Sequence, residues 1–326
     1  MFCFHKKKKN NAKIFVIIGI IIGAAAAAAG AYFLFTKVLK DKLCKKNCEE
    51  IEAVPYDMMI SGADSEAVSQ LRLWKAKNVQ NFNMGLFTQG QYARAVEEST
   101  NAETISKVLY PSDEHTEGKL LRLSQQYFLV SASLQSIISD HIAAYGSLIG
   151  FADKVAIHIN DTHPALCVPE LMRILMDVYN FTWDDAWYTV TKTVSYTNHT
   201  VMSEALEKWP LDLLGSVVPE IVEIIKRVDA KLKSEHPNLF IIKDNTAHMA
   251  NLSVYVGTYV NGVAEIHSQI LKDDCFKEWY YAYPERFQNK TNGITQRRWL
   301  GLCNPELCAL LDEAGIEGYL SDLYKL

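Results

Sequence analysis

The sequence predicts an α/β protein built of two unlike parts, and three observations carry this prediction. The chain has 326 residues, a length that corresponds to about two domains. Its 49% apolar and 22% charged residues are typical of a globular protein and exclude a disordered or collagen-like chain. Short β-rich runs are followed directly by longer segments with helical periodicity, as in layered α/β domains.

The first part, residues 1–50, contains an apolar run. Residues 14–35 carry no charge, and a bilayer core requires about 20 apolar helical residues. Lysines flank both ends of the run, so no orientation is predicted. We therefore expect a transmembrane helix over residues 14–35. A cleaved signal peptide is the alternative, but its apolar region usually has only about 7–15 residues.

Charge distinguishes the two parts and argues against one class of function. Residues 1–50 carry a net charge of +7, and residues 51–326 carry −12 of the overall −5. Nucleic-acid binding relies on Lys and Arg that neutralise phosphates, so an acidic body argues against it. The seven cysteines are widely spread and form neither a disulfide framework nor a zinc pattern, which favours reduced thiols in the cytoplasm.

From residue 51 onward, helices are predicted where apolar residues recur at intervals of three and four. In chain order these segments are residues 65–77, 120–141, 168–178, 211–233 and 249–271. Pro219 should break or restart the fourth segment, and glycines interrupt the fifth. Thr182 to Asp185 resembles a capping box that opens another helix through Thr193.

Two β-rich runs, residues 154–159 and 191–194, lead into polar turns, and a short helix is expected over 204–209. The first turn is Asn160-Asp161-Thr162-His163. In open α/β sheets ligands bind beyond the carboxyl ends of the strands, so these side chains are candidates for hydroxyl recognition. Capping of the next helix by Asp161 or Thr162 is the alternative, and a metal site at Asp161 and His163 would lack a third ligand.

The second polar turn is Tyr196-Thr197-Asn198-His199-Thr200, for which a hydrogen-bonded turn is the alternative to a binding site. A third polar segment runs from Asn289 to Thr295, followed by Arg297, Arg298 and Trp299. It has the composition of an anion- or ring-binding segment or of an inter-domain surface. The motifs of P-loop, dinucleotide-binding, serine-hydrolase and zinc-protease sites do not occur.

Several longer runs occur in one order along residues 51–326. They are LRLW (71–74), KVLYP (107–111), LRLSQQYF (121–128), INDTHPALCVPELMRIL (159–175), YTNHTVMSEALEKWP (196–210), VNGVAEIHS (260–268) and FQNKTNGITQRRWL (287–300). This series resembles the α-glucan phosphorylases, the family of the glycogen and maltodextrin enzymes. The resemblance implies a fold class: an incomplete Rossmann-like N-terminal domain of a two-domain GT-B type glycosyltransferase, here preceded by the apolar helix.

The resemblance also implies an activity. Enzymes of this family are homodimers that use orthophosphate to cleave the terminal α-1,4 bond of a glucan, releasing glucose 1-phosphate. Their cofactor, pyridoxal 5'-phosphate, is bound to a lysine that the resemblance places outside this chain. We therefore expect residues 51–326 to be inactive alone. The alternatives are a non-catalytic, membrane-tethered glucan-binding module and a fragment that does not fold stably.

Site residues follow from the same resemblance. His199 is implied to be catalytic, because its imidazole contacts the glucose 6-hydroxyl and its backbone carbonyl stabilises the oxocarbenium-like charge. The implied substrate-binding residues are Asn160, Asp161, His163, Asn198, Thr200 and, in a mobile gate loop, Asp113. The sequence departs from the family pattern, in gate-loop and domain-interface details, at Glu114, His115, Asn251, Thr258 and Gln296.

Overall fold

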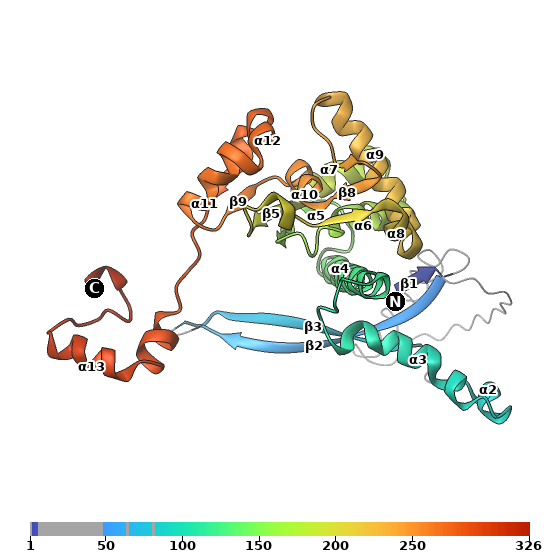
Figure 1. The fold of residues 1–326 in the computed structure, drawn as a ribbon, viewed down its shortest axis with the longest axis horizontal. Coiled ribbons are helices and arrows are strands. Elements are labelled where there is room, and N and C mark those ends of the chain that lie inside the picture. The colour runs from blue at the N-terminus through green and yellow to red at the C-terminus, as the bar shows by residue number, and fades with distance from the viewer. Residues whose placement is uncertain (1, 6–47, 63–64, 80–81) are drawn as a thin grey trace.

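A four-stranded parallel sheet organises the part of the chain that carries the predicted site (Figure 1). The computed structural model describes residues 2–5, 48–62, 65–79 and 82–326. The spatial order of the sheet is β10-β9-β5-β4, and every neighbouring pair is parallel. Its strands are β4 (Ile157–Asn160), β5 (Val194–Asn198), β9 (Val260–Gly262) and β10 (Phe287–Asn289).

Helical crossovers join these strands, as parallel pairing requires. Between β4 and β5 lie α6 (Cys167–Arg173), a π-helical turn (Ile174–Val178) and α7 (Trp183–Thr193). Between β5 and β9 lie α8 (Leu211–Val217), α9 (Pro219–Glu235) and α10 (Met249–Val256). Between β9 and β10 lie α11 (Glu265–Ile270), a π-helical turn (Leu271–Cys275), α12 (Lys277–Ala282) and a 3₁₀ turn (Pro284–Arg286).

The core forms where α4 (Thr116–Tyr145) packs against α6 and α8, and α6 packs against α7 and α9. Leu123, Leu134 and Ile138 of α4 are buried there together with Leu171 and Met172 of α6. At the end of α4, Gly146 adopts a left-handed conformation with φ of 76° and donates its amide to the Ile142 carbonyl.

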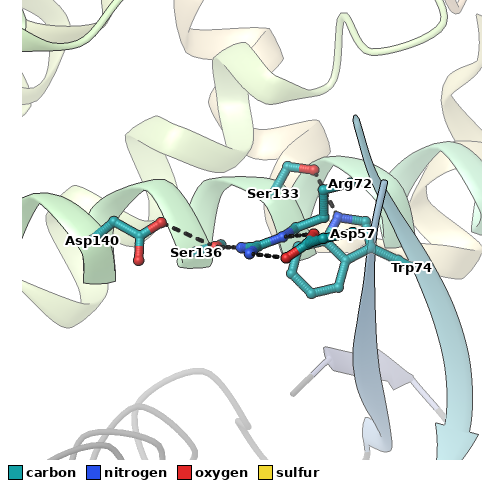
Figure 2. Close-up of polar contacts among 6 residues, drawn as sticks. All are labelled: Asp57, Arg72, Trp74, Ser133, Ser136 and Asp140. Carbon is teal, nitrogen blue, oxygen red and sulfur yellow. Dashed lines mark hydrogen bonds and ion pairs between the residues drawn. The ribbon is translucent and has the colours of Figure 1, made fainter. Parts of the chain in front are cut away.

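A long antiparallel hairpin, β2 (Cys48–Ser61) with β3 (Val68–Asn78), lies against α4, and the short β1 (Phe2–His5) pairs with β2. Figure 2 shows the contact that joins them: the Arg72 guanidinium donates to both carboxylate oxygens of Asp57, at 2.7 and 2.8 Å, and to Ser136 Oγ. Trp74 Nε1 donates to Ser133 Oγ. These bonds attach one face of the hairpin to the helix.

The remaining elements lie at the periphery. A small antiparallel sheet contains β6 (Lys208–Pro210), β8 (Thr246–His248) and β7 (Ile242–Lys243). Figure 1 shows α3 and α2 projecting from the body, and α13 reached through an extended segment. The bounds are α2 Met84–Thr88, α3 Tyr92–Lys107, α5 Phe151–Lys154, α13 Pro305–Glu313, a π-helical turn Arg297–Leu302 and 3₁₀ turns Ser203–Ala205 and Leu323–Lys325.

The structure confirms several predicted elements. The α/β class, the helices over 120–141 and 168–178 and the strand within 154–159 are all present. The predicted break at Pro219 separates α8 from α9, with the proline in the first turn of α9. Thr182 caps α7 by accepting the Asp185 amide, and its hydroxyl donates to the Asp185 carboxylate.

Other predictions are wrong. Residues 65–77 form most of β3 rather than a helix, because they pair with β2. Arg72 and Trp74, two residues apart, both bond to α4, which is the two-residue period of a strand. The expected helix over 204–209 is a 3₁₀ turn followed by β6. Residues 191–193 of the predicted β-rich run are the last residues of α7, and only Val194 belongs to a strand, as the first residue of β5. Within 249–271 the segment between the two glycines contains β9.

The predicted transmembrane helix over 14–35 lies outside the described residues. Within residues 2–5, 48–62, 65–79 and 82–326, no helix combines the length and the apolar character that crossing a bilayer requires.

Candidate functional site

The four parallel strands end at one edge of their sheet, and that edge is polar. Their last residues are Asn160, Asn198, Gly262 and Asn289. The order of the strands places the two predicted turns, 160–163 and 196–200, next to each other at the ends of β4 and β5. Ligand sites of open α/β sheets lie at this edge.

A hydrogen bond joins the two turns. His199 Nε2 lies 2.6 Å from Asn160 Oδ1, and the Asp161 amide donates to the Thr197 carbonyl at 2.9 Å. An amide oxygen can only accept, so His199 Nε2 carries the proton. In the neutral imidazole, Nδ1 is then left as an acceptor. Asn160 and His199 are both exposed.

Asp161 has an unusual backbone conformation, with φ of 61°, a region that Asp and Asn tolerate better than most residues. Its Oδ1 accepts the amide of Thr162 at 2.6 Å. Helix α6 begins only at Cys167, with Leu166 as its N-cap and no side-chain capping bond. The helix-capping alternative for Asp161 and Thr162 is therefore wrong.

The second turn is held by the fully buried side chain of Asn198. Its Oδ1 accepts the Thr200 amide at 2.9 Å and lies 3.1 Å from His267 Nε2, and its Nδ2 donates to the Tyr196 hydroxyl at 3.0 Å. The hydrogen-bonded turn expected as an alternative is thus present, and it carries His199 at its centre.

Two histidines near His199 have lowered pKa values. Burial is the main reason why the pKa values of His158 and His267 are lowered, and the neighbouring charge of His199 lowers both further. His158 Nε2 contacts the Thr197 hydroxyl, which also accepts from Asn261 Nδ2 at 3.2 Å. Both rings therefore lose their proton more readily than a free imidazole does.

The third polar segment completes the edge. The Lys290 amide donates to the Gly262 carbonyl, and the Asn292 amide donates to the Val263 carbonyl. Ser268 Oγ lies 3.1 Å from Asn289 Oδ1. In contrast, Arg297, Arg298 and Trp299 lie in the π-helical turn beyond this segment, where Trp299 exposes 68% of its surface.

Asp113 and His163 belong to a neighbouring cluster. Asp113 lies 3.6 Å from the Arg122 guanidinium, which is also 3.6 Å from Glu207 Oε1 and lies over the ring of Tyr110. The Tyr110 and His163 rings meet edge to face, with centroids 6.0 Å apart.

This cluster borders a pocket of about 350 Å³ whose lining is mostly apolar; it includes Leu73, Trp74, Ile105, Leu109, Phe128 and Leu129. The hydroxyl groups of a glucose ring lie around its rim and require polar partners, which the sheet edge provides in greater number than this pocket does.

The structure thus brings Asn160, Asp161, Asn198, His199 and Thr200 together, and it places Asp113 and His163 in the adjoining cluster. Residue-level reasoning missed His267, Asn261, Arg122 and Glu207. A signal for them was present, because all four lie within the runs LRLSQQYF, YTNHTVMSEALEKWP and VNGVAEIHS.

The described residues do not fit a covalently bound pyridoxal phosphate. Such a site requires a lysine beside the reacting sugar and several cationic donors for the phosphate. At the sheet edge Lys290 is exposed, and its ammonium donates to Gln288 Oε1 and to the Asn289 carbonyl. In the part of the chain that the structure describes, no three His, Cys, Asp or Glu side chains converge as metal ligands would.

Comparison with known proteins agrees with the motifs. A family model described as carbohydrate phosphorylase matches residues 34–326. The chain is 44% identical over 292 residues to a glycogen phosphorylase of Chlamydia pneumoniae, covering 85% of this chain and 35% of that protein. It is 45% identical over 296 residues to the brain form of Rattus norvegicus, covering 84% and 35%, and 46% identical over 276 residues to the Bacillus subtilis (strain 168) enzyme, covering 81% and 34%.

The chain therefore spans about 35% of the length of the relatives it matches. The family match begins before the expected boundary at residue 51, and the division into 1–50 and 51–326 stays a prediction. Since the family model covers most of the sequence and several glycogen phosphorylases are more than 40% identical to it, the chain belongs to the carbohydrate phosphorylase family.

Proposed function

We propose that this chain forms one wall of the substrate site of an α-glucan phosphorylase, as part of the N-terminal Rossmann-like domain of a GT-B enzyme. The reaction is cleavage of the terminal α-1,4 bond of glycogen, maltodextrin or starch by orthophosphate, which yields glucose 1-phosphate. The observation that carries the proposal is the hydrogen bond between Asn160 and His199, because it joins two polar turns from neighbouring strands into one surface.

The chemistry of this surface suits a glucose ring. Because Nε2 of His199 donates to Asn160, Nδ1 accepts a hydrogen bond from a hydroxyl group of the ligand. We assign this donor as the glucose 6-hydroxyl. Asp161 uses Oδ1 for the Thr162 amide, and its second oxygen accepts a further hydroxyl. The backbone carbonyl of His199 is a fixed dipole that stabilises positive charge developing on the sugar in the transition state.

Phosphate activation requires groups that these residues do not provide. Orthophosphate carries nearly two charges and needs several cationic donors in a desolvated site. The sheet edge supplies asparagines, histidines, threonines and one aspartate, and its lysine, Lys290, is exposed and donates to Gln288 and to the Asn289 carbonyl. We therefore propose that the 326-residue chain binds glucan but releases no glucose 1-phosphate without a further protein surface that holds pyridoxal phosphate and orthophosphate.

Calorimetric titration with maltoheptaose tests the proposal. Saturable binding by the wild-type chain, weakened about tenfold by His199→Ala, is expected, since one hydrogen bond to a sugar contributes about 1.5 kcal/mol. Asn101→Ala, at an exposed position of α3, is the control. Absence of binding at millimolar maltoheptaose, or equal binding by His199→Ala, would overturn the proposal.

The second candidate, a glucan-binding module without catalysis, is favoured by the lack of fit to the cofactor. A phosphorylase wall should prefer a chain end, because only the terminal bond is cleaved. We therefore expect linear maltoheptaose to bind more tightly than a cyclic glucan with the same number of glucose units. Equal affinity for both would favour the binding module.

Association and location are also proposals. Homodimer formation is supported by the exposed aromatic side chains of Phe82, Phe87 and Tyr92 on the projecting α2–α3 unit (Figure 1), and sedimentation velocity tests it. The unpaired thiols of Cys167, Cys275, Cys303 and Cys308 suit a reducing cytoplasm. Membrane attachment through residues 14–35 stays a prediction, which fractionation of the expressed chain would test.

A further inference from the structure

A residue outside the predicted set contacts the turn that carries His199. His267 lies in α11, which follows β9 directly. Its ring is partly buried between Val263, in the loop after β9, and Asn198, at the end of β5. It therefore connects two strands of the sheet at the edge where the substrate site is proposed.

Both ring nitrogens of His267 have assigned roles. The Val263 amide donates to Nδ1 at 3.0 Å, so Nδ1 must be unprotonated. The proton of the neutral ring is therefore on Nε2, which donates to Asn198 Oδ1 at 3.1 Å. A doubly protonated ring would lose the bond from Val263.

Asn198 transmits this contact to the site. The oxygen that accepts from His267 also accepts the Thr200 amide, so one atom holds both the helix and the far side of the turn. The amide nitrogen of Asn198 donates to the buried Tyr196 hydroxyl. With all three bonds made, the Asn198 side chain has one orientation, and the backbone of His199 lies between Asn198 and Thr200 in a fixed conformation.

The backbone allows α11 to approach closely at one glycine. A β-carbon added to Gly262 would lie 2.2 Å from Ser268 Oγ and 2.8 Å from Ser268 Cα. Only glycine therefore permits α11 to lie against the end of β9 with His267 within reach of Asn198. Ser268 Oγ also lies 3.1 Å from Asn289 Oδ1, so α11 contacts the ends of β5, β9 and β10.

We propose that His267 is a positioning residue of the glucan site: through its Nε2–H it fixes Asn198, and thereby sets the direction of the His199 carbonyl and imidazole. The inference deepens the proposed function and rests on it for the identity of the sugar ligand. The geometric part, that His267 controls the conformation of residues 198–200, is tested without any ligand.

Two variants separate the two bonds of the ring. A glutamine amide nitrogen reaches the position of the histidine Nε2 and preserves the donor to Asn198. An asparagine oxygen reaches the position of Nδ1 and preserves the acceptor for Val263, but it leaves Asn198 Oδ1 without its donor. We expect His267→Gln to bind maltoheptaose within about twofold of wild type and His267→Asn to bind about tenfold more weakly.

Nuclear magnetic resonance of the 326-residue chain supplies the ligand-free readout. The ¹⁵N spectrum of wild type is expected to show His267 as the neutral Nε2–H tautomer. The Thr200 amide and His199 ring signals should shift in His267→Asn and return towards wild type in His267→Gln.

The outcomes distinguish the two proposals. Wild type that binds no maltoheptaose but shows the expected tautomer and Thr200 shifts contradicts the proposed function and supports the positioning role. An Nδ1–H tautomer, or His267→Asn with wild-type Thr200 and His199 signals, overturns the positioning role. If His267→Asn does not fold, the tautomer of His267 in the wild-type chain tests the positioning role. The Nε2–H form supports that role, and the Nδ1–H form overturns it.

Discussion

The side chains of His199 and Asn160 meet at 2.6 Å, although they belong to turns 39 residues apart in sequence. The contact exists because β4 and β5 are parallel neighbours in register, with Asn160 opposite Thr197. Two polar turns that follow different strands therefore form one surface, and the imidazole orientation depends on an amide from the other strand.

Replacement of Asn160 by alanine should leave His199 without its partner. We expect maltoheptaose binding about tenfold weaker, from the loss of about 1.5 kcal/mol, and a His199 ¹⁵N spectrum that shows a mixture of tautomers. Asn101→Ala, at an exposed position of α3, is the control and should match wild type. Unchanged binding and an unchanged His199 tautomer in Asn160→Ala would contradict the role assigned to this contact.

Replacement of Gly262 by alanine should destabilise the sheet edge, because the new β-carbon would overlap Ser268. We expect a loss of about 1–3 kcal/mol in the free energy of unfolding, measured by urea denaturation. Gly215→Ala in α8 is the control: the nearest neighbour of its β-carbon would be Val222 Cγ2 of α9, at 3.8 Å, so it should be neutral or stabilising by up to about 1 kcal/mol. Equal stability of the two variants would show that α11 can move away from β9 at no cost.

The bond between Arg72 of β3 and Asp57 of β2, which orients Arg72 towards α4, should weaken in acid. The hydrogen bond from Arg72, with a smaller contribution from Gln70, lowers the pKa of Asp57 from 3.8 to about 2. A carboxyl group whose pKa is lower in the folded state contributes stability above its unfolded pKa and loses it as the pH falls towards the folded value.

The stability difference between wild type and Asp57→Asn should therefore be constant above about pH 4 and shrink between pH 4 and pH 2. Urea denaturation midpoints measure it. If the stability difference between wild type and Asp57→Asn does not change between pH 4 and pH 2, the bond between Arg72 and Asp57 is contradicted.

The histidines around His199 should titrate below the ordinary value of 6.5. Burial disfavours the charged forms of His158 and His267, and the charge of His199 adds to this effect. For a histidine with a lowered pKa, the folded state binds fewer protons than the unfolded chain, so stability is lost as the pH falls below about 6.5.

Titration of the imidazole resonances measures both values. In His199→Ala both pKa values should rise but stay below 6.5, since burial remains. Values at or above 6.5 in wild type would contradict the burial of these rings.

The sequence predicted the crossover helices well because their apolar stripes are long and their ends are marked. Thr182 and Pro219 begin helices where expected. Short strands were harder to predict. The three residues of β9, the last of which is Gly262, form a strand only because they pair with β5 and β10, a long-range effect that local periodicity does not contain. The apolar residues of β3 have spacings compatible with both the helical period and the two-residue period of a strand. Pairing with β2 selects the strand.

The site was predictable to the extent that its residues follow strands directly. Asn160, Asp161, Asn198 and His199 were identified because they end or follow β-rich runs. His267 was not identified, because it lies in a helix and reaches Asn198 across 69 residues of sequence through the close approach at Gly262. Asp113 was assigned to the site by resemblance, and in the structure its partner is Arg122 in the adjoining cluster.

Mapping of backbone and imidazole resonances during titration with maltoheptaose tests most directly that the two turns form one sugar-binding surface. We predict saturable shifts at residues 160–161 and 198–200 with a single dissociation constant, and the loss of both sets of shifts in His199→Ala. Shifts confined to the apolar pocket beside Tyr110 and Arg122, or different dissociation constants for the two turns, would contradict the account.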